Sequence, residues 1–289
     1  MWFFYAISYA LIVSVYLLIY KKILSESDEY LVLLSSAIFT MPVILIIVIF
    51  FYGFPQFDST FIYSSIVSIC MGSLAAILAY RALKISDISL VKPISAFNPV
   101  FTALISYFAL KEIIKPIGWL GIFLVVFGAY ILNLKSLKKN LIAPFRTFIK
   151  NKGVRLSLIA YFLWSITPIF EKISIKHTFP LTPPFVALVG YFGTSLIYFP
   201  LVIKKSKNPI KIVIKNLKLF IIGGILAGIA QSFAYITFSL TSLGIATAVF
   251  KTSIIFTVLI GSVFFKEKNI IQRFIGSLVM LAGVVLLVI

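Results

Sequence analysis

The stretch PVFTALISYFALKE, Pro99–Glu112, returns later in the chain as IIFTVLIGSVFFKE, residues Ile254–Glu267. It belongs to a longer match, because residues 72–134 align without a gap onto residues 227–289 at a constant offset of 155. Apolar matches alone are weak evidence in so apolar a chain. In the same register, however, a charged pair and two glycines also recur: Lys111–Glu112 as Lys266–Glu267, Gly121 as Gly276 and Gly128 as Gly283. The chain therefore contains an internal repeat.

Composition indicates the surroundings in which this repeat folds. Of 289 residues, 61% are hydrophobic and 12% are charged, whereas a soluble domain devotes about a quarter of its residues to charge. An apolar stretch of roughly 20 residues crosses a bilayer as a helix, because only intrachain partners can satisfy its backbone there. Cutting the chain at charged and turn residues predicts ten such helices: 2–21, 30–52, 61–83, 88–110, 115–134, 155–175, 184–203, 217–239, 244–265 and 270–289.

The longest polar interval lies between the fifth and sixth expected helices. We therefore expect a first five-helix repeat at 1–134, a basic linker at 135–153 and a second repeat at 154–289. Because five is an odd number, the second repeat enters the membrane in the opposite orientation. The predicted fold class is an all-α integral membrane protein of about ten transmembrane helices in two inverted five-helix repeats.

Several functional classes are disfavoured. The net charge of +18 comes from Lys and Arg in short gaps between apolar runs, which does not make the basic face that a nucleic acid needs. The single cysteine, Cys70, and the single histidine, His177, supply neither a disulfide framework nor a metal set. An embedded enzyme would need paired carboxylates, a metal set or an activated nucleophile. We expect no enzymatic activity and no cofactor.

The repeated segments, together with Trp164, Ser165 and Lys172 at the start of the second half, resemble the ten-helix EamA-type carriers of the drug/metabolite transporter superfamily. The resemblance covers nearly the whole chain. It implies a carrier with a substrate site between the halves, and it leaves the substrate open.

Positive charge predicts the orientation. The loops after odd-numbered helices hold 20 of the 26 Lys and Arg residues, and basic loops stay on the cytoplasmic side. The count predicts both termini outside, although members of the family that the chain resembles more often have both termini in the cytoplasm.

Two lysines lie inside expected helices, Lys92 in the fourth and Lys251 in the ninth. A charge at membrane depth costs at least about 2.5 kcal/mol, so it usually faces a cavity or a partner. Lys251 is expected to face a cavity and attract an anionic group. Lys92, near the start of its helix, has two interpretations, a cavity residue or a side chain that extends to the interface, and the second is favoured.

Polar and aromatic residues near these lysines are candidate substrate contacts: Asn98, Ser95, Thr247, Ser253, Gln231 and Trp164. The small polar residues also fit an alternative role, in which they only allow helices to pack closely. Glu112 is expected to interact with the N-terminus of the next helix, 115–134. Glu171 is read as lying near a helix end, so no mid-helix carboxylate is expected, and a proton-coupled cation exporter is disfavoured.

The sequence thus predicts a secondary transporter that moves a small metabolite by alternating access. An anionic metabolite, such as an amino acid or an organic phosphate, is among the candidates. Alternatives are a multidrug or cationic compound exporter and a non-transporting membrane receptor or assembly protein. The expected partners are a small-molecule substrate and the lipid bilayer, with no nucleic acid. A monomer or homodimer in the plasma membrane is expected.

Overall fold

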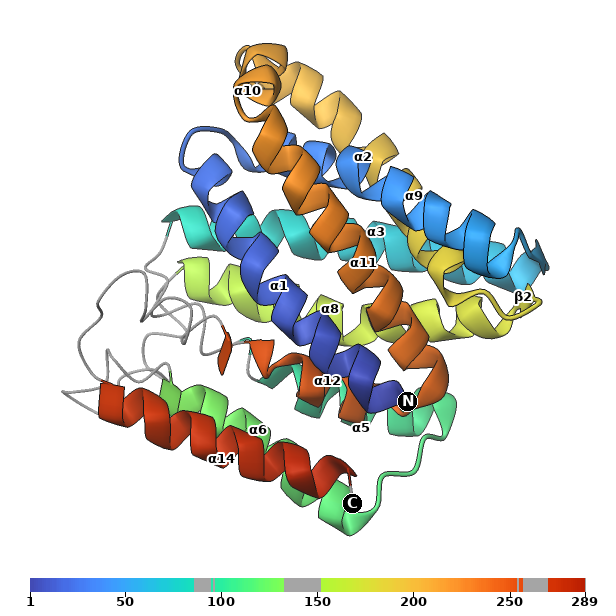
Figure 1. Cartoon of the computed structure of the whole chain (residues 1–289), viewed down its shortest axis with the longest axis vertical. Coiled ribbons are helices and arrows are strands. Elements are labelled where there is room, and N and C mark those ends of the chain that lie inside the picture. Colours follow the sequence, from blue (N-terminus) through green and yellow to red (C-terminus); the bar gives the residue numbers. More distant parts are fainter. Residues whose placement is uncertain (86–94, 96, 133–151, 254, 257–269, 289) are drawn as a thin grey trace. The chain divides into compact units, whose positions relative to one another are not determined.

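The structure, a computed structural model, describes residues 1–85, 95, 97–132, 152–253, 255–256 and 270–288. Helices account for nearly all of the described residues (Figure 1). In chain order the elements are α1 (Trp2–Leu24), α2 (Glu29–Ile47), the π-helix η1 (Val48–Tyr52), β1 (Gln56–Phe57), α3 (Ser59–Ile85), α5 (Asn98–Leu110), α6 (Pro116–Leu132), α8 (Lys152–Lys176), β2 (Thr178–Phe179), α9 (Pro183–Lys205), α10 (Pro209–Lys215), α11 (Leu217–Leu240), α12 (Leu243–Phe250) and α14 (Ile270–Val288).

These elements follow the expected helices closely, with two kinds of difference. The short helix α10 lies in the basic loop before α11 and was not expected. Parts of the expected helices 88–110 and 244–265 lie outside the described residues, as do Lys92 and most of the linker. α5 begins at Asn98, and Pro99 occupies its first turn, where a missing N–H costs no hydrogen bond.

Six described helices are long and apolar enough to cross a membrane. They are Trp2–Leu24, Glu29–Tyr52, Ser59–Ala82, Lys152–Lys176, Pro183–Lys205 and Leu217–Leu240. Shorter apolar stretches lie in α5, α6 and α14, at Asn98–Leu110, Pro116–Gly128 and Leu278–Leu287. Lipid-facing surface explains why large apolar side chains such as Phe50, Phe108 and Ile203 are exposed.

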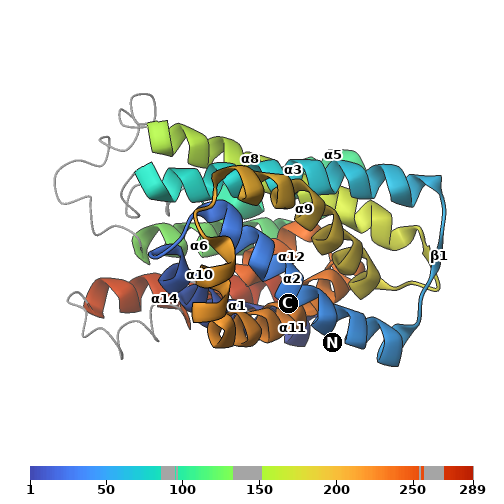
Figure 2. The same cartoon turned by 90° about the horizontal axis from the view of Figure 1, so that it is seen from above.

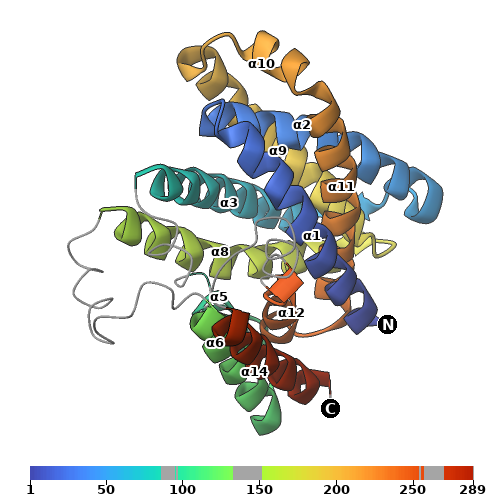
Figure 3. The ribbon, with the colours of Figure 1, turned by 60° about the vertical axis from the view of Figure 1, so that its left-hand side comes forward.

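The first of two compact units contains Met1–Ser73 and Phe170–Leu240. Within it, α1 packs along α11, and α2 packs against α9 and α11 (Figures 1 and 3). A Cβ added at Gly224 of α11 would lie 2.5 Å from the carbonyl oxygen of Phe39 in α2. Glycine at this position lets the two backbones approach closely, as is common between membrane helices.

The second compact unit contains Leu74–Ile169 and Thr241–Ile289. α6 and α14 lie side by side and run in opposite directions (Figures 1 and 3). A Cβ added at Gly128 of α6 would lie 2.6 Å from the carbonyl oxygen of Gly276 in α14. α12 packs on α5 and α6 in the same unit, and Gly244 meets Ala103 there.

The compact units do not coincide with the two sequence repeats. Each repeat supplies helices to both units, and α3 and α8 each have residues in both. The boundaries 1–134 and 154–289 therefore remain a prediction about the repeat, and they do not describe separately packed domains.

One end of the first unit carries a small strand pair. β1 and β2 are antiparallel, with Gln56 opposite Phe179 and Phe57 opposite Thr178. Figure 2 shows the chain passing through β1 into α3. The ring of Phe57 stacks against Phe185 of α9 at 5.9 Å between centroids. The pair therefore joins the start of α3 to the end of α8.

Candidate functional site

Lys251 follows directly after the last residue of α12. α12 ends at Phe250, and the N–H groups of Lys251 and Thr252 bond to the carbonyl oxygens of Ala248 and Val249, at 3.1 and 3.0 Å. These bonds reach three residues back and tighten the last turn. The lysine is half-buried, and its ammonium lies 5.8 Å from the centroid of the Tyr161 ring in the second unit. The cation–π geometry keeps the charge at a defined place.

Tyr161 is the centre of this cluster, and sequence reasoning missed it. Its hydroxyl is hydrogen-bonded to Ser95, and its ring lies 5.5 Å from that of Trp164 in a tilted arrangement. Three of the predicted contacts, Lys251, Ser95 and Trp164, therefore meet around one unpredicted tyrosine. A usable signal was the spacing of Tyr161, Trp164 and Ser165, which places all three on one side of α8.

Asn98 connects two helices of the same unit. Its side-chain nitrogen donates to Ser165 Oγ at 2.8 Å and to the Tyr161 carbonyl oxygen at 3.3 Å. Ser165 Oγ is also placed to donate to the Tyr161 carbonyl oxygen at 2.7 Å. Asn98 is 7% exposed and Ser165 is fully buried. This arrangement favours the packing interpretation for Asn98, because its amide is already used in joining α5 to α8.

The remaining predicted contacts differ in their relation to Lys251. Thr247 is buried and donates to the Leu243 carbonyl oxygen at 2.7 Å, so its hydroxyl serves its own helix. Ser253 is half-buried, two residues beyond Lys251. Gln231 lies on α11 and belongs to the first unit, whereas Lys251 belongs to the second. Lys92 lies outside the described residues.

Glu112 has a structural contact, but with a different helix from the one expected. Its Oε2 accepts a hydrogen bond from the Leu243 N–H at 2.8 Å, and Leu243 is the first residue of α12. The expected interaction with the N-terminus of the following helix, α6, stays a prediction. Lys111 adopts a left-handed conformation at φ 54° and turns the chain after α5, next to the residue that contacts α12. The physical role is the expected one, since a carboxylate at a helix N-terminus meets unpaired N–H groups.

Glu171 lies near the end of α8, as expected, because α8 ends at Lys176, one residue beyond the predicted end. The sequence did not indicate which side chains surround its carboxylate. Its carboxylate accepts a hydrogen bond from Ser68 Oγ of α3 at 3.4 Å and another from Tyr235 of α11. All three residues belong to the first unit. The described part of the chain therefore contains a carboxylate inside a membrane helix, held by two hydroxyls.

Comparison with known proteins gives a family and a fold. The family model described as the EamA-like transporter family matches residues 1–134 and 151–289, so it covers both repeats. One solved crystal structure has a TM-score of 0.79 over 99% of this chain and 95% of the other, at 12% sequence identity. That identity is evidence for the fold alone. No curated protein sequence matches significantly.

These matches confirm the all-helical membrane fold with two repeats and the multi-pass character predicted from the sequence. They also confirm the resemblance that the repeated segments carry, because the family model spans most of the chain. The chain belongs to the EamA-like transporter family.

Proposed function

We propose that the protein is a secondary carrier that moves a small metabolite with an anionic group across the membrane by alternating access. Lys251, with Tyr161, Ser95 and Trp164 around it, holds the anionic group of the substrate. Family membership supports transport of a small molecule. The substrate class and the mechanism are the proposal's own additions.

The surroundings of Lys251 carry the substrate assignment. Among the described residues, the contact made by its ammonium is with the face of the Tyr161 ring. An aromatic face attracts a cation but cannot neutralise it as a carboxylate does. A lysine inside a membrane protein, with no neutralising partner among the residues that the structure describes, gains from an anion that enters its surroundings. A carboxylate or a phosphate supplies such a charge.

The inverted repeat supports alternating access. Two equivalent halves of opposite orientation can exchange conformations, and the exchange opens a shared site to one side and then to the other. An interrupted helix at the site is also typical of such carriers, because it presents backbone groups to the substrate. The end of α12 directly before Lys251 is compatible with such a site.

Counterflow in liposomes tests the proposal. The purified chain is reconstituted, loaded with one unlabelled solute and supplied with the labelled form outside, for a panel of amino acids, organic phosphates, nucleotide sugars and cationic drugs. We expect anionic solutes to accumulate transiently and Lys251→Ala to abolish that accumulation. Lys205→Ala is the matched control, since Lys205 lies 4.9 Å from the centroid of the Tyr30 ring at the end of α9.

The outcomes separate this proposal from its rivals. Unchanged anion uptake in Lys251→Ala would show that the lysine does not bind the substrate. Movement of cationic drugs alone would favour a cation exporter, and absence of counterflow for the whole panel would favour a receptor or assembly protein. The proposal includes no enzymatic activity and assigns a monomer or homodimer to the plasma membrane, which fractionation and size measurement in detergent can test.

A further inference from the structure

Polar side chains follow one another along the contact between α3 and α8 in the first unit. On the α3 side they are Asp58, Ser64, Ser65 and Ser68, and on the α8 side they are His177, Ser174 and Glu171. Ser64 and Ser68 of α3 are four residues apart, and Glu171 and Ser174 of α8 are three apart, so each pair lies on one face of its helix. Asp58 directly precedes α3, and His177 directly follows α8. We refer to these seven residues as the α3–α8 ladder. Its two ends have different surroundings.

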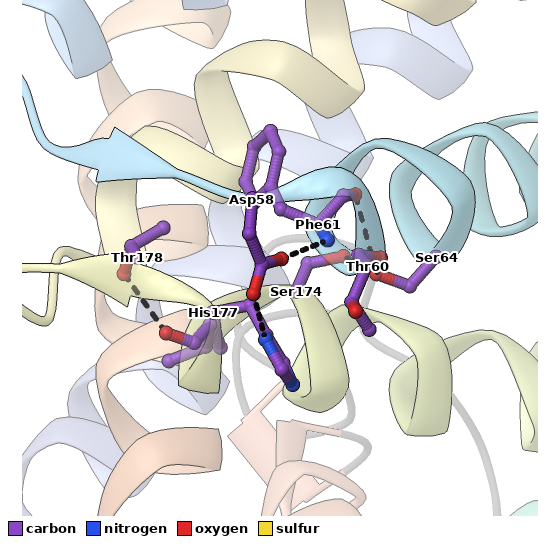
Figure 4. A network of polar contacts seen from close by, with 8 residues as sticks. Asp58, Thr60, Phe61, Ser64, Ser174, His177 and Thr178 are labelled. Carbon is purple, nitrogen blue, oxygen red and sulfur yellow. Dashed lines mark hydrogen bonds and ion pairs between the residues drawn. The ribbon is translucent and has the colours of Figure 1, made fainter.

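The outer end of the α3–α8 ladder is exposed. His177 Nδ1 lies 2.7 Å from Asp58 Oδ2, and their side chains are 35% and 45% exposed (Figure 4). Asp58 Oδ1 also accepts a hydrogen bond from the Phe61 N–H at 3.1 Å. The hydrogen bond from His177, helped by that from Phe61, lowers the pKa of Asp58 below its ordinary value. Both side chains are therefore able to exchange protons with water.

The middle of the α3–α8 ladder is buried and consists of hydroxyls. Ser64 Oγ and Ser174 Oγ lie 2.7 Å apart (Figure 4). Ser65 Oγ donates to Ser174 Oγ at 3.1 Å. Ser174 is fully buried, and Ser64 and Ser65 are each 6% exposed. A hydroxyl donates one proton and accepts others, and it can rotate between partners. Hydroxyls in contact are therefore able to pass a proton along.

The inner end of the α3–α8 ladder is the carboxylate of Glu171, one turn from Ser174. Its hydrogen-bond partners among the described residues are the hydroxyls of Ser68 and Tyr235. Tyr9 of α1 also lies close to the carboxylate, and Tyr191 of α9 lies close to Tyr235. Lys172, the next residue along α8, is buried as well. The neighbours on α1, α3 and α11 are thus neutral hydroxyl groups.

A carboxylate in such surroundings is costly to keep charged. Hydroxyl donors stabilise the anion only in part, and the membrane interior withholds the water that would complete its solvation. A proton neutralises the negative charge of the carboxylate and needs less space than any other cation. Intramembrane carboxylates with access to a chain of polar groups are the usual components of proton pathways.

We propose that Glu171 binds and releases a proton during the transport cycle, and that the α3–α8 ladder connects it to water at the β1–β2 end of the first unit. A proton from water reaches the Asp58–His177 pair, passes over the hydroxyls of Ser64, Ser65 and Ser174, and neutralises the Glu171 carboxylate. Its release restores the negative charge. The three-residue step from Glu171 to Ser174 corresponds to a rise of about 4.5 Å along α8, a gap that a single bridging water spans.

This inference rests on the proposed carrier function and deepens it, because it adds proton coupling. The two are tested by separate readouts. Liposomes that hold the reconstituted chain and the pH-sensitive dye pyranine report proton movement when a solute that passes the counterflow test is added outside. Counterflow itself reports substrate exchange and needs no net proton movement.

Glu171→Gln mimics the protonated side chain. We expect it to keep counterflow exchange and to reduce solute-dependent proton movement to the level of protein-free liposomes. Glu26→Gln is the matched control, since Glu26 is an exposed carboxylate between α1 and α2 that pairs with Lys215. Wild-type proton movement in Glu171→Gln would overturn the inference. So would loss of counterflow in folded Glu171→Gln, which would assign the carboxylate to substrate binding.

The hydroxyl pathway has its own test. We expect Ser174→Ala to slow the initial rate of proton movement about tenfold and Ser174→Thr to restore it, because threonine keeps the hydroxyl. Ser195→Ala is the control, since this half-buried serine donates to the Phe192 carbonyl oxygen of its own helix. If Ser174→Ala and Ser174→Thr move protons equally fast, the serines only pack the helices and the pathway is refuted. Solute exchange without any proton movement by the wild type would refute the coupling and leave the carrier function intact.

Discussion

Gly121 of α6 packs against Gly283 of α14 so closely that a Cβ added at Gly121 would lie 2.8 Å from the Gly283 carbonyl oxygen. Seven residues further along α6, Gly128 packs against Gly276 of α14 in the same manner. By the offset of 155, Gly276 is the repeat equivalent of Gly121, and Gly283 is that of Gly128. The contact is therefore reciprocal, as between two copies of one surface, and the equivalent helices run antiparallel. This is the arrangement that an inverted repeat requires.

Substitution at this contact should destabilise the protein. We expect Gly121→Ala and Gly283→Ala each to cost about 1–3 kcal/mol, because the added methyl group forces two backbones apart. Thermal unfolding in detergent measures the loss. Gly190→Ala is the control, since a Cβ there would meet the Tyr235 hydroxyl at an ordinary 3.6 Å. Equal unfolding temperatures for all three variants would contradict the packing argument.

Removal of the Glu112 carboxylate should loosen the start of α12. We expect Glu112→Ala to lower stability by about 1 kcal/mol, since the Leu243 N–H loses its acceptor at a helix N-terminus. Glu112→Gln keeps an acceptor oxygen and should lose less. Hydrogen exchange at residues 243–246 localises the effect. An unchanged exchange rate in Glu112→Ala would show that the contact does not hold α12.

The contributions of Asn98 and Ser165 to stability should be coupled. We expect the cost of Asn98→Ala to shrink by about 1 kcal/mol when Ser165 is already alanine, because the hydrogen bond between them is lost only once. A double-mutant cycle on unfolding free energy measures this coupling. Strictly additive costs would show that the bond contributes nothing, and both side chains would become available for substrate.

Asp58 should make the stability of the fold depend on pH in the acidic range. Its pKa in the folded chain lies below the ordinary 3.8, so its stabilising contribution is complete above that value and is lost as the pH falls through the folded pKa. We expect the wild type to lose stability below pH 3.8 more steeply than Asp58→Asn. Unfolding temperatures across this range measure the difference. Parallel curves would mean that the pair with His177 does not stabilise the fold.

The ring of Tyr161 should matter more than its hydroxyl for the position of Lys251. We expect Tyr161→Phe to retain anion counterflow and Tyr161→Leu to raise the half-saturating concentration several-fold, because only the aromatic face holds the ammonium in place. Trp164, on the same side of α8, is intact in both variants. Equal kinetics for the two would indicate that the lysine is positioned by other contacts.

The sequence alone determined the membrane fold, the repeat and several components of the site. Hydropathy has a length scale set by the bilayer, so the helices that the structure describes in full were predicted to within a few residues of their ends. The repeated glycines and the pair Lys111–Glu112 were visible because they recur at one offset. Lys251 was visible because a charge within an apolar run is expensive.

Only the tertiary structure decided what these residues contact. The chain turns at the left-handed Lys111, and Glu112 contacts the first residue of α12. Tyr161 joins Lys251 across 90 residues of chain, and Ser68 joins Glu171 across 103. Such contacts depend on which helix faces lie together, and periodicity in one helix says nothing about its neighbour. Glu171 appeared to lie at a helix end in the sequence, and the helices packed around it place its carboxylate inside a hydroxyl cluster.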